Sequence, residues 1–394
     1  MKLFFIKIGK LWNVLRRDGL MRGGQRVLAA VRSAREMRRV APGDILFITN
    51  GVGDSARYRA RHVAEELILN GFRASVTAQD NPRLLSYADT FRVFIFHRVL
   101  YTENIRKTIE KIKKREKEII FEADDLVHDP AFLPHMAGYE LMNSLERKLY
   151  ENGLGREIVE DPYVRAATTT TSYLARKLRE KDKKVFVVTN KLAEEDRLMA
   201  EGILPKATKD VSVVTLCYLS GTASHNRDFA TITEPLLALL AKHQNLRLLV
   251  AGPLDLDPAF ERFRSQVRKQ AFVPWREHFE IMAQCDINLA PLEIGNPFCE
   301  GKSELKFFEA GIVKVPTVAS ATETFREAIT DGVDGFAALS KGEWQDKLEK
   351  LILDAELRLA MGRRARETAL SRYTTKNGKS PEYYQYLREK IGKQ

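Results

Sequence analysis

Residues 300–311, EGKSELKFFEAG, carry three glutamates, two lysines and a serine immediately before the apolar run IVKVPTVAS. Ser303 is suited to be the N-cap of a helix, and Lys302 directly precedes it. Amide N–H groups at such a helix start bind anions such as phosphate, and Glu304 agrees with the helix dipole. Glu309 can accept hydrogen bonds from two vicinal hydroxyls, such as those of a ribose. The pattern favours a site for the diphosphate and ribose of a sugar nucleotide, although the same spacing also fits a solvated helix face.

Two further turns follow apolar runs and open helices. The first contains Gly51 and Gly53, and the second contains Gly221 with Arg227 close behind it. Free backbone N–H groups in such turns meet an anion or a hydroxyl-rich ligand, and the fixed fork of Arg227 matches a phosphate. The first turn lacks the third glycine of GxGxxG, and no P-loop lysine follows it. A plain strand-to-helix turn and a capping loop are the alternatives.

Acidic and imidazole side chains end two other apolar runs. His97 ends VFIFH, and Asp124 and Asp125 end EIIFEADD. These residues are predicted to contact sugar or acceptor hydroxyls. A metal site or an acid–base pair is the alternative for the two aspartates, and a structural role is the alternative for His97.

Asp255 and Asp257 form a DxD pattern, but their position before a proline favours a polar turn and a helix start.

Short apolar strands alternate with helical patterns along most of the 394 residues. A first series of strands covers DILFITN, SVTAQ, VFIFH, EIIFEADD, the start of AATTTTSYLARKL, and VFVVTN. A second series begins at 211 with VSVVTLCYLSG and continues through LRLLVAG, DINLAPL and PTVAS, with a helix expected through FRSQVRK. This alternation predicts an α/β fold of two Rossmann-like domains, each with a doubly wound parallel sheet. Ligands bind beyond the carboxyl ends of such strands, so the two domains should face a central cleft.

The predicted domains are an N-terminal arm at 1–42, an acceptor-side domain at 43–200, and a nucleotide-sugar-binding domain at 201–376. A C-terminal helix at 377–394 could pack back on the first of the two domains.

The net charge of +11 is concentrated in the arm. Met1–Val40 holds 11 basic residues and 2 acidic ones, with an amphipathic pattern of leucines and aromatic residues in its early part. Such a helix lies on anionic lipid, and each basic residue contributes about 1 kcal/mol near the surface. The alternatives are a helix packed on the protein or a disordered arm. Nucleic-acid binding is not expected, because the excess charge is confined to the arm and no known motif accompanies it.

The cysteines and the hydropathy pattern indicate the cellular compartment that we expect for the protein. Cys217, Cys285 and Cys299 form no CxxC pair, and the sequence shows no cleavable signal and no apolar run of about 18 residues. We therefore expect a reducing, cytoplasmic protein that does not span a membrane. Cys217 and Cys285 are expected in the core.

Several motifs in order carry a resemblance to a known family. These are SGTASHNRDF, LRLLVAGP, AFVPW, DINLAPL, NPFCEGKSELKFFEAGIVKVPTVAS and FREAITDGVDGFAA, within residues 211–375. Together they resemble the nucleotide-binding half of retaining GT-B glycosyltransferases of family four, also called group one glycosyl transferases. The first half, with GVGDSARYRARHVAEEL and IIFEADDLVHD, resembles the acceptor-side domain of that family more loosely.

The resemblance implies roles for individual residues. Arg227 and Lys302 would hold the donor diphosphate, Glu309 the ribose, and the main chain around Val273 the base. The turn at Gly51 and Gly53 would close on the sugar or the phosphate. The remaining residues predicted to bind the donor are Gly221, Ser303, Glu304 and Leu305.

The sequence departs from the family at one position. The family has two glutamates eight residues apart, but Gly301 stands eight residues before Glu309, between Glu300 and Glu304. Glu300 is favoured as the contact to the transferred sugar because it is expected on the loop and not within the helix. Separately, KSELK matches the Lys-Ser-x-x-Lys helix start that a subset of the family has here.

The resemblance implies a glycosyltransferase that moves a hexose from a nucleotide sugar, with retention, to a glycan or a lipid-linked acceptor in cell-surface polysaccharide synthesis. No cofactor or metal is expected, and a peripheral position on the inner membrane face is expected through residues 1–40. The alternatives are a non-catalytic scaffold of the same fold and a sugar-nucleotide epimerase. The donor base, the sugar, the acceptor and the oligomeric state stay open.

Overall fold

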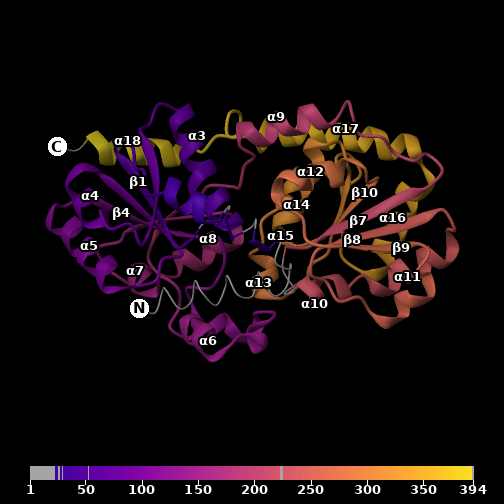
Figure 1. The fold of residues 1–394 in the computed structure, drawn as a ribbon, viewed down its shortest axis with the longest axis horizontal. Helices are drawn as coiled ribbons and strands as arrows, with labels where there is room; N and C mark the ends of the chain where they lie inside the picture. Colours follow the sequence, from indigo (N-terminus) through magenta and orange to yellow (C-terminus); the bar gives the residue numbers. More distant parts are fainter. Residues whose placement is uncertain (1–22, 25–26, 29, 52, 222–224, 393–394) are drawn as a thin grey trace.

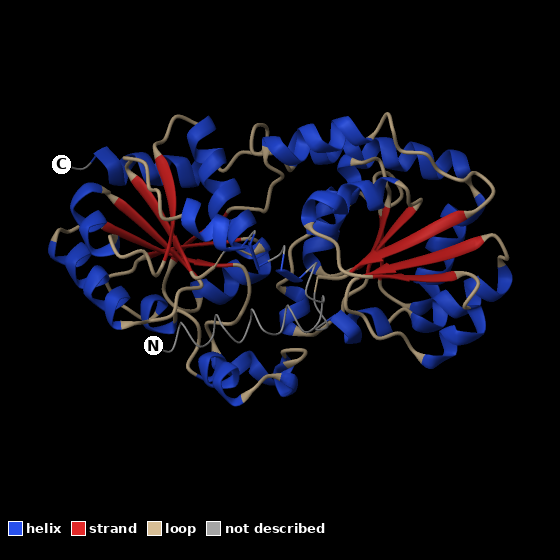
Figure 2. Ribbon diagram, viewed as in Figure 1, coloured by secondary structure: helices blue, strands red, loops and turns tan. Residues whose placement is uncertain are grey.

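The computed structural model describes residues 23–392, apart from 25–26, 29, 52 and 222–224. Two α/β domains lie side by side, each built on a parallel six-stranded sheet with helices on both faces (Figures 1 and 2). The predicted fold of two doubly wound, Rossmann-like domains is therefore confirmed. None of the helices in the described residues is long and apolar enough to cross a membrane.

The strands of the first domain run in the order β2-β1-β3-β4-β5-β6. Their bounds are β1 (Ile45–Thr49), β2 (Ala74–Ala78), β3 (Val93–His97), β4 (Glu118–Ala123), β5 (Ala166–Thr169) and β6 (Lys184–Val187). The helices are α2 (Asp54–Ala56), a π-helical segment (Arg57–His62), α3 (Val63–Leu69), α4 (Leu84–Thr90), α5 (Glu103–Lys114), α6 (Ser144–Glu151), α7 (Arg156–Val159) and α8 (Ser172–Arg179), with 3₁₀ turns at Pro130–His135 and Tyr139–Leu141.

Both faces of this sheet are covered, which explains the continuous apolar runs in its central strands. Ile45 and Phe47 of β1 point to the face covered by α3, whereas Leu46 and Ile48 point to the face covered by α4 and α5. The successive side chains alternate between the two faces. All four are at most 1% exposed, so neither face of β1 meets solvent.

The strands of the second domain run in the order β12-β11-β10-β7-β8-β9. Their bounds are β7 (Val214–Leu219), β8 (Leu246–Ala251), β9 (Val267–Gln270), β10 (Ile287–Ala290), β11 (Thr317–Ser320) and β12 (Phe336–Ala338). The helices are α9 (Glu194–Ile203), α10 (Asn226–Ala230), α11 (Thr233–Lys242), α12 (Trp275–Ala283), α13 (Pro297–Glu300), α14 (Leu305–Ile312), α15 (Glu323–Ala328), α16 (Lys341–Leu353) and α17 (Ala355–Arg372), with a 3₁₀ turn at Pro258–Phe263. Cys217 and Cys285 are buried in the core of this domain.

The chain crosses between the domains twice. Leu192 and Tyr373 lie side by side at the crossings, where the amide of Leu192 donates to the carbonyl of Tyr373 (2.8 Å). After the second crossing, α18 (Pro381–Gly392) packs on the first domain, and Tyr383 and Leu387 join the core beside Phe47. Figure 1 shows α18 beside α3 and α17 lying over the second domain.

The predicted boundary between residues 200 and 201 falls inside α9. Ala200 of this helix is buried in the core of the second domain, and α9 packs on α12. The first crossing therefore lies before α9, around Leu192, and the whole helix belongs to the second domain.

The C-terminal part of the arm contacts the first domain. Residues 30–36 are helical, Met37 is 5% exposed, and Arg38 pairs with Asp80 at 3.1 Å. The guanidinium of Arg61 also donates to Ser33. The early part of the arm, residues 1–22, which carries the predicted amphipathic pattern, lies outside the described residues.

The helix predicted through FRSQVRK is wrong, because the chain forms edge strand β9 there. The preceding 3₁₀ turn begins where the carboxylate of Asp257 accepts the amide of Ala259 (2.8 Å), in agreement with the predicted polar turn. Gln266 then donates from Nε2 to the carbonyls of Leu240, His243 and Leu246. These bonds hold the segment along β8, so ladder pairing outweighs its helical pattern.

Candidate functional site

A cavity of about 270 Å³ lies between the domains, beyond the carboxyl ends of strands from both sheets. We call it the cleft cavity. The lining residues from the first domain and the first crossing are Asp54, Ser55, Tyr58, Arg98, Asp124 and Asn190. Those from the second domain are Tyr218, His225, Ala290, Pro291, Leu292, Lys302, Ser303, Leu305, Lys306 and Phe325. Its position is the one where doubly wound sheets bind ligands.

One wall of the cleft cavity is a polar network after β1, β3 and β4. Ser55 donates from Oγ to Asp124 Oδ2 (2.7 Å), and His97 Nε2 lies 3.0 Å from the same hydroxyl. His97 Nδ1 meets Thr49 Oγ1 at 2.9 Å, so the ring is held on both sides. The structure therefore brings Asp124 to the cavity, and places the 1% exposed His97 behind Ser55.

Arg98 controls the charge of this wall. Its guanidinium pairs with both Asp124 and Asp125. Burial by itself would raise the pKa of Asp124, but Arg98 and the hydrogen bonds from His97 and Ser55 outweigh it and hold the pKa well below its usual range. Asp124 is therefore an ionised acceptor at neutral pH and a weak base. Arg98 has a φ of 47°, and side chains in this left-handed region concentrate at functional sites.

Asp125 serves the turn after β4 and not the cleft cavity. It is 7% exposed, its Oδ1 accepts the amide of Val127 (3.0 Å), and its Oδ2 meets Arg98. The two adjacent aspartates therefore have different surroundings.

The opposite wall is the start of α14. Lys302 lines the cavity and has no hydrogen bond or salt bridge from its side chain within the part of the chain that the structure describes. Lys306 lies one turn on, donates from Nζ to the carbonyl of Leu219, and sits 4.5 Å from the centre of the Tyr218 ring. Burial lowers its pKa. Two cations and the amide end of a helix thus face one cavity, which is an arrangement suited to a phosphate.

The N-cap assigned to Ser303 is wrong. Helix α14 begins at Leu305 with Glu304 at the N-cap position, and the Ser303 hydroxyl instead accepts from Nδ2 of Asn190 (2.8 Å). This bond joins the first crossing to the start of α14. Glu304 points away from the cleft cavity and lines another one, described below.

Glu309 contacts the first domain. It accepts from the Tyr58 hydroxyl at Oε1 (2.5 Å) and lies 3.9 Å from Nη2 of Arg57. Arg57 itself pairs with Asp196 (2.9 Å) and stacks on Trp275 at 4.4 Å. Burial raises the pKa of Glu309, whereas Tyr58 and Arg57 act in the opposite direction. The Oε1 atom of Glu309 could accept from a ribose hydroxyl only if that hydroxyl took the place of Tyr58.

Glu300 does not line the cleft cavity. Its carboxylate accepts the amides of Gly295 (3.0 Å) and Glu323 (3.3 Å), the second of which begins α15. Gly301 is buried, and a Cβ there would lie 3.0 Å from the Leu174 side chain of α8. At the position where the family has its first glutamate, the Leu174 side chain of the other domain therefore packs closely against the backbone. Of the described carboxylates, those that line the cleft cavity belong to Asp54 and Asp124.

The other predicted donor-binding residues lie outside the cavity lining. Arg227 has 59% of its side chain exposed and donates to Glu293 (2.9 Å). Val273 is half-buried before α12. Gly51, Gly53 and Gly221 are exposed, and a Cβ at any of them would have no neighbour within 4 Å among the described residues. The roles proposed for these residues stay predictions.

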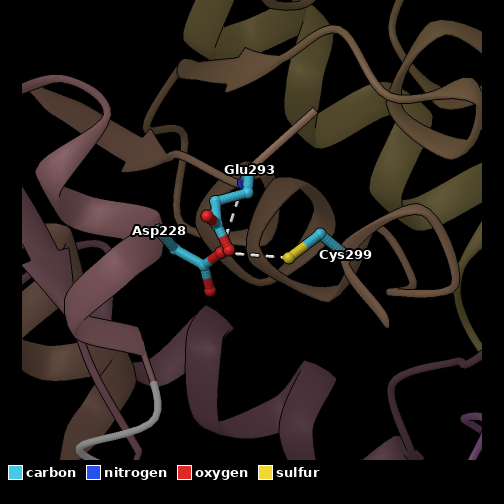
Figure 3. A group of neighbouring side chains, drawn as sticks. All are labelled: Asp228, Glu293 and Cys299. Atoms are coloured by element: carbon cyan, nitrogen blue, oxygen red, sulfur yellow. Dashed lines mark hydrogen bonds between the residues drawn. The ribbon is translucent and has the colours of Figure 1, made fainter. Parts of the chain in front are cut away.

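Asp228, Glu293 and Cys299 bring potential ligand atoms within 4.8 Å of one another (Figure 3). Asp228 Oδ1 accepts from the Cys299 thiol (3.1 Å) and from the amide of Glu293 (3.2 Å), while Oδ2 meets Nδ1 of His225 (2.9 Å). Burial, together with Asp228, raises the pKa of Cys299, so the thiol keeps its proton and donates it. The group is a hydrogen-bonded junction that fixes the loop before α13 against α10.

Sequence reasoning missed several residues of the cleft cavity. Ser55, Tyr58 and Asn190 line it, and none of them was assigned a role from the sequence. Lys306 also lines it, and the sequence indicated it only as the second lysine of KSELK. Tyr58 and Asn190 gave no local signal, because they reach the cavity only through the packing of the two domains.

The chain resembles known proteins in sequence over its second domain and in fold over most of its length. Residues 227–378 match the family model described as "Glycosyl transferase-like". No curated protein sequence matches the chain. Among solved structures, a glycosyltransferase from Rickettsia africae has a TM-score of 0.59 at 12% identity, with 90% of this chain and 100% of the other covered.

Two further structures contain ligands named with them. Anabaena HepE in complex with UDP has a TM-score of 0.55 at 12% identity, covering 89% of this chain and 99% of that one. A TarM mutant from S. aureus, in complex with fondaparinux, alpha-GlcNAc-glycerol and UDP, has a TM-score of 0.50 at 12% identity. That match covers 77% of this chain and 55% of TarM, so the chain spans about half of TarM. These likenesses show the two-domain fold of GT-B glycosyltransferases.

Proposed function

We propose that the protein is a glycosyltransferase that moves a hexose from a nucleoside diphosphate sugar to a glycan or lipid-linked acceptor, with retention at the anomeric carbon. The observation that carries this proposal is the cleft cavity, where Lys302 and Lys306 from one domain face Ser55 and Asp124 from the other. The glycosyl transferase-like family match over residues 227–378 supports the same class of reaction.

The α14 wall supplies what the leaving group needs. As the bond between the anomeric carbon and the phosphate oxygen breaks, negative charge grows on the diphosphate. Lys302, Lys306 and the amides at the start of α14 are positioned to stabilise that charge, which is the largest contribution that a protein makes to such a reaction. Because this charge comes from the chain itself, the proposal needs no metal or other cofactor.

The wall that contains Asp124 can hydrogen-bond to sugar hydroxyls, but it is poorly suited to accept a proton. Its low pKa makes Asp124 a poor proton acceptor at neutral pH, but an ionised carboxylate binds sugar hydroxyls well. The acceptor oxygen forms the new bond to the anomeric carbon on the face that the diphosphate leaves, and the acceptor proton passes to a diphosphate oxygen. This front-face route retains the configuration and requires no protein base.

Nucleotide binding tests the proposal directly. Thermal unfolding is measured with UDP, GDP and ADP for the wild type, for Lys302→Met and Lys306→Met, and for Lys269→Met as a control on the exposed part of β9. At least one nucleotide should stabilise the wild type and the control. Loss of one charge-assisted hydrogen bond to phosphate corresponds to about 1.5–3 kcal/mol, so affinity should fall about 10- to 100-fold in each cleft variant.

Turnover is measured next as release of the nucleotide from the corresponding UDP, GDP or ADP sugars. The proposal fails if no nucleotide binds the wild type, or if both cleft variants bind as tightly as Lys269→Met.

We further propose a cytoplasmic protein held peripherally on the inner membrane face, with a role in cell-surface polysaccharide synthesis. The basic residues of 1–40 support this location. Deleting residues 1–22 keeps the buried Met37 and should release the protein from vesicles that contain anionic lipid, while nucleotide binding is retained. Continued binding of the truncated chain to these vesicles would exclude the arm as the anchor.

A further inference from the structure

A second cavity, of about 340 Å³, lies on the other side of the crossing segments. We call it the hinge cavity, since both crossings and both domains line it. Its lining residues are Thr170, Thr171, Ser172, Val187, Thr189, Glu304, Thr324, Glu327, Ala328, Ser371, Arg372, Tyr373, Asn377, Gly378 and Lys379. The volume lies at the lower end of the range of about 300–1,000 Å³ for small-molecule sites.

The hinge cavity is separate from the cleft cavity. Residues that are neighbours in the chain line different cavities. Ser303 and Phe325 line the cleft cavity, whereas Glu304 and Thr324 line the hinge cavity. The hydrogen bond from Asn190 to Ser303 joins two residues that line the cleft cavity. A ligand in one cavity therefore does not occupy the other.

Three buried side-chain polar atoms with no hydrogen-bond partner among the described residues belong to residues that line the hinge cavity. They are Oγ1 of Thr170, Oε2 of Glu304 and Oγ1 of Thr324, and their residues are 1%, 4% and 5% exposed. Thr170 comes from the first domain, whereas Glu304 and Thr324 come from the second. An unsatisfied buried polar atom costs about 1–3 kcal/mol, so three of them around one cavity indicate a place built to bind hydroxyl groups.

The charges of the lining select a neutral occupant. Glu327, and Glu304 once it has lost its proton, would repel an anion. The two cations are already engaged, since Arg372 donates to the carbonyl of Ala328 (3.3 Å) and Lys379 donates to Asn70 (3.1 Å). The rest of the polar lining is mainly hydroxyl groups, which both donate and accept. A neutral molecule with many hydroxyls matches this lining better than a phosphate or a fully apolar ligand does.

We propose that the hinge cavity is a second saccharide site, which binds one sugar unit through Thr170, Glu304 and Thr324. The inference goes beyond the proposed transfer reaction and does not depend on it. Since Ser172 of the first domain donates to Glu327 of the second (3.0 Å) at this cavity, a sugar bound there also bridges the two domains. Its occupancy would favour the domain arrangement seen in the structure.

Ligand-observed saturation-transfer NMR tests the site, with glucose, mannose, galactose and N-acetylglucosamine as the probes at millimolar concentration. Thr170→Val/Thr324→Val keeps the side-chain volume and removes two unpartnered hydroxyls, so the double variant should fold. Ser371→Trp instead covers the cavity from an exposed position. Lys306→Met reports on the cleft cavity.

At least one sugar should give a signal with the wild type. Two lost hydrogen bonds should weaken its binding at least about fivefold in the double variant. Ser371→Trp should also lose the signal, whereas Lys306→Met should keep it. The proposal is overturned if none of the four sugars gives a signal, if the double variant and Ser371→Trp bind like the wild type, or if only Lys306→Met loses the signal, which would assign the sugar to the cleft cavity.

Discussion

Replacing Glu304 by glutamine should make the stability of the second domain less dependent on pH. Glu304 is 4% exposed, and burial raises its pKa to about 7, although Tyr373 and Arg372 act in the opposite direction. The folded chain therefore keeps a proton that the unfolded chain releases near its ordinary value of 4.5. Between these two values the unfolded state binds fewer protons, so the stability of the wild type falls as the pH rises.

The size of the effect follows from the two pKa values. Their separation corresponds to about 3 kcal/mol, fully expressed above pH 7 and absent well below pH 4.5. Glutamine has the same shape and no charge to bury. Glu304→Gln should therefore be more stable than the wild type by about 2–3 kcal/mol at pH 8, and by less than about 1 kcal/mol at pH 5.

Urea unfolding followed by tryptophan fluorescence measures this difference at pH 5, 6, 7 and 8. Trp275 and Trp344 lie in the same domain as Glu304, so the signal reports on the relevant transition. Glu327→Gln is the matched control, because this glutamate lines the same cavity but is exposed. A stability difference between Glu304→Gln and the wild type that stays constant from pH 5 to pH 8, or that favours the wild type at pH 8, would refute the reasoning.

Three other substitutions test contacts within each domain and between the two domains. Arg59→Ala should cost about 3–5 kcal/mol in urea unfolding, because the fully buried Arg59 makes two bonds to Glu122 (2.7 and 3.0 Å) and its loss leaves a buried carboxylate unpaired. Tyr58→Phe should lower stability by about 1–3 kcal/mol without nucleotide and enlarge the stabilisation that nucleotide gives, if ribose replaces Tyr58 at Glu309. Gly311→Ala should lower the thermal midpoint, because the new Cβ would lie 2.7 Å from a backbone oxygen of α17.

Each of these predictions has a contrary result. Arg59→Lys should recover part of the stability that Arg59→Ala loses. If both variants lose the same stability, a positive charge alone does not stabilise the buried Glu122 carboxylate. If nucleotide stabilises Tyr58→Phe and the wild type equally, ribose does not replace Tyr58 at Glu309. An unchanged midpoint in Gly311→Ala would show that α14 and α17 can move apart at little cost.

The fold could be predicted from the sequence because hydrophobic periodicity and secondary-structure propensity indicate the same elements over most of the chain. Buried strands such as β1 and β3 are continuous apolar runs flanked by helical patterns, and a parallel sheet requires both features. The segment of β9 could not be predicted, since its pattern is helical, whereas its backbone pairs with β8 and the Gln266 side chain donates to three distant carbonyls. Long-range hydrogen bonds of this kind leave no local signature.

Only part of the candidate site could be predicted from the sequence. Lys302 and Asp124 follow strands, and the topology of a doubly wound sheet places them at the cavity. Arg227 and Glu300 have equally suitable types, but their charges are taken by Glu293 and by backbone amides. Sequence shows which groups are able to bind a phosphate or a sugar. It does not show which of them have found a partner within the chain.

The segment EGKSELKFFEAG brings these points together, because its three glutamates end in three different surroundings. Glu300 accepts the first amide of α15, Glu304 lines the hinge cavity, and Glu309 accepts from Tyr58 of the other domain. The cause is geometric: the loop before α14 is a wall between two cavities, so adjacent side chains face opposite ways. Gly301, which stands where the family has its first glutamate, carries no carboxylate and packs against α8. The described carboxylates that line the cleft cavity, Asp54 and Asp124, both come from the first domain, and the fixed and ionised Asp124 is the one best placed to contact the sugar in the proposed reaction.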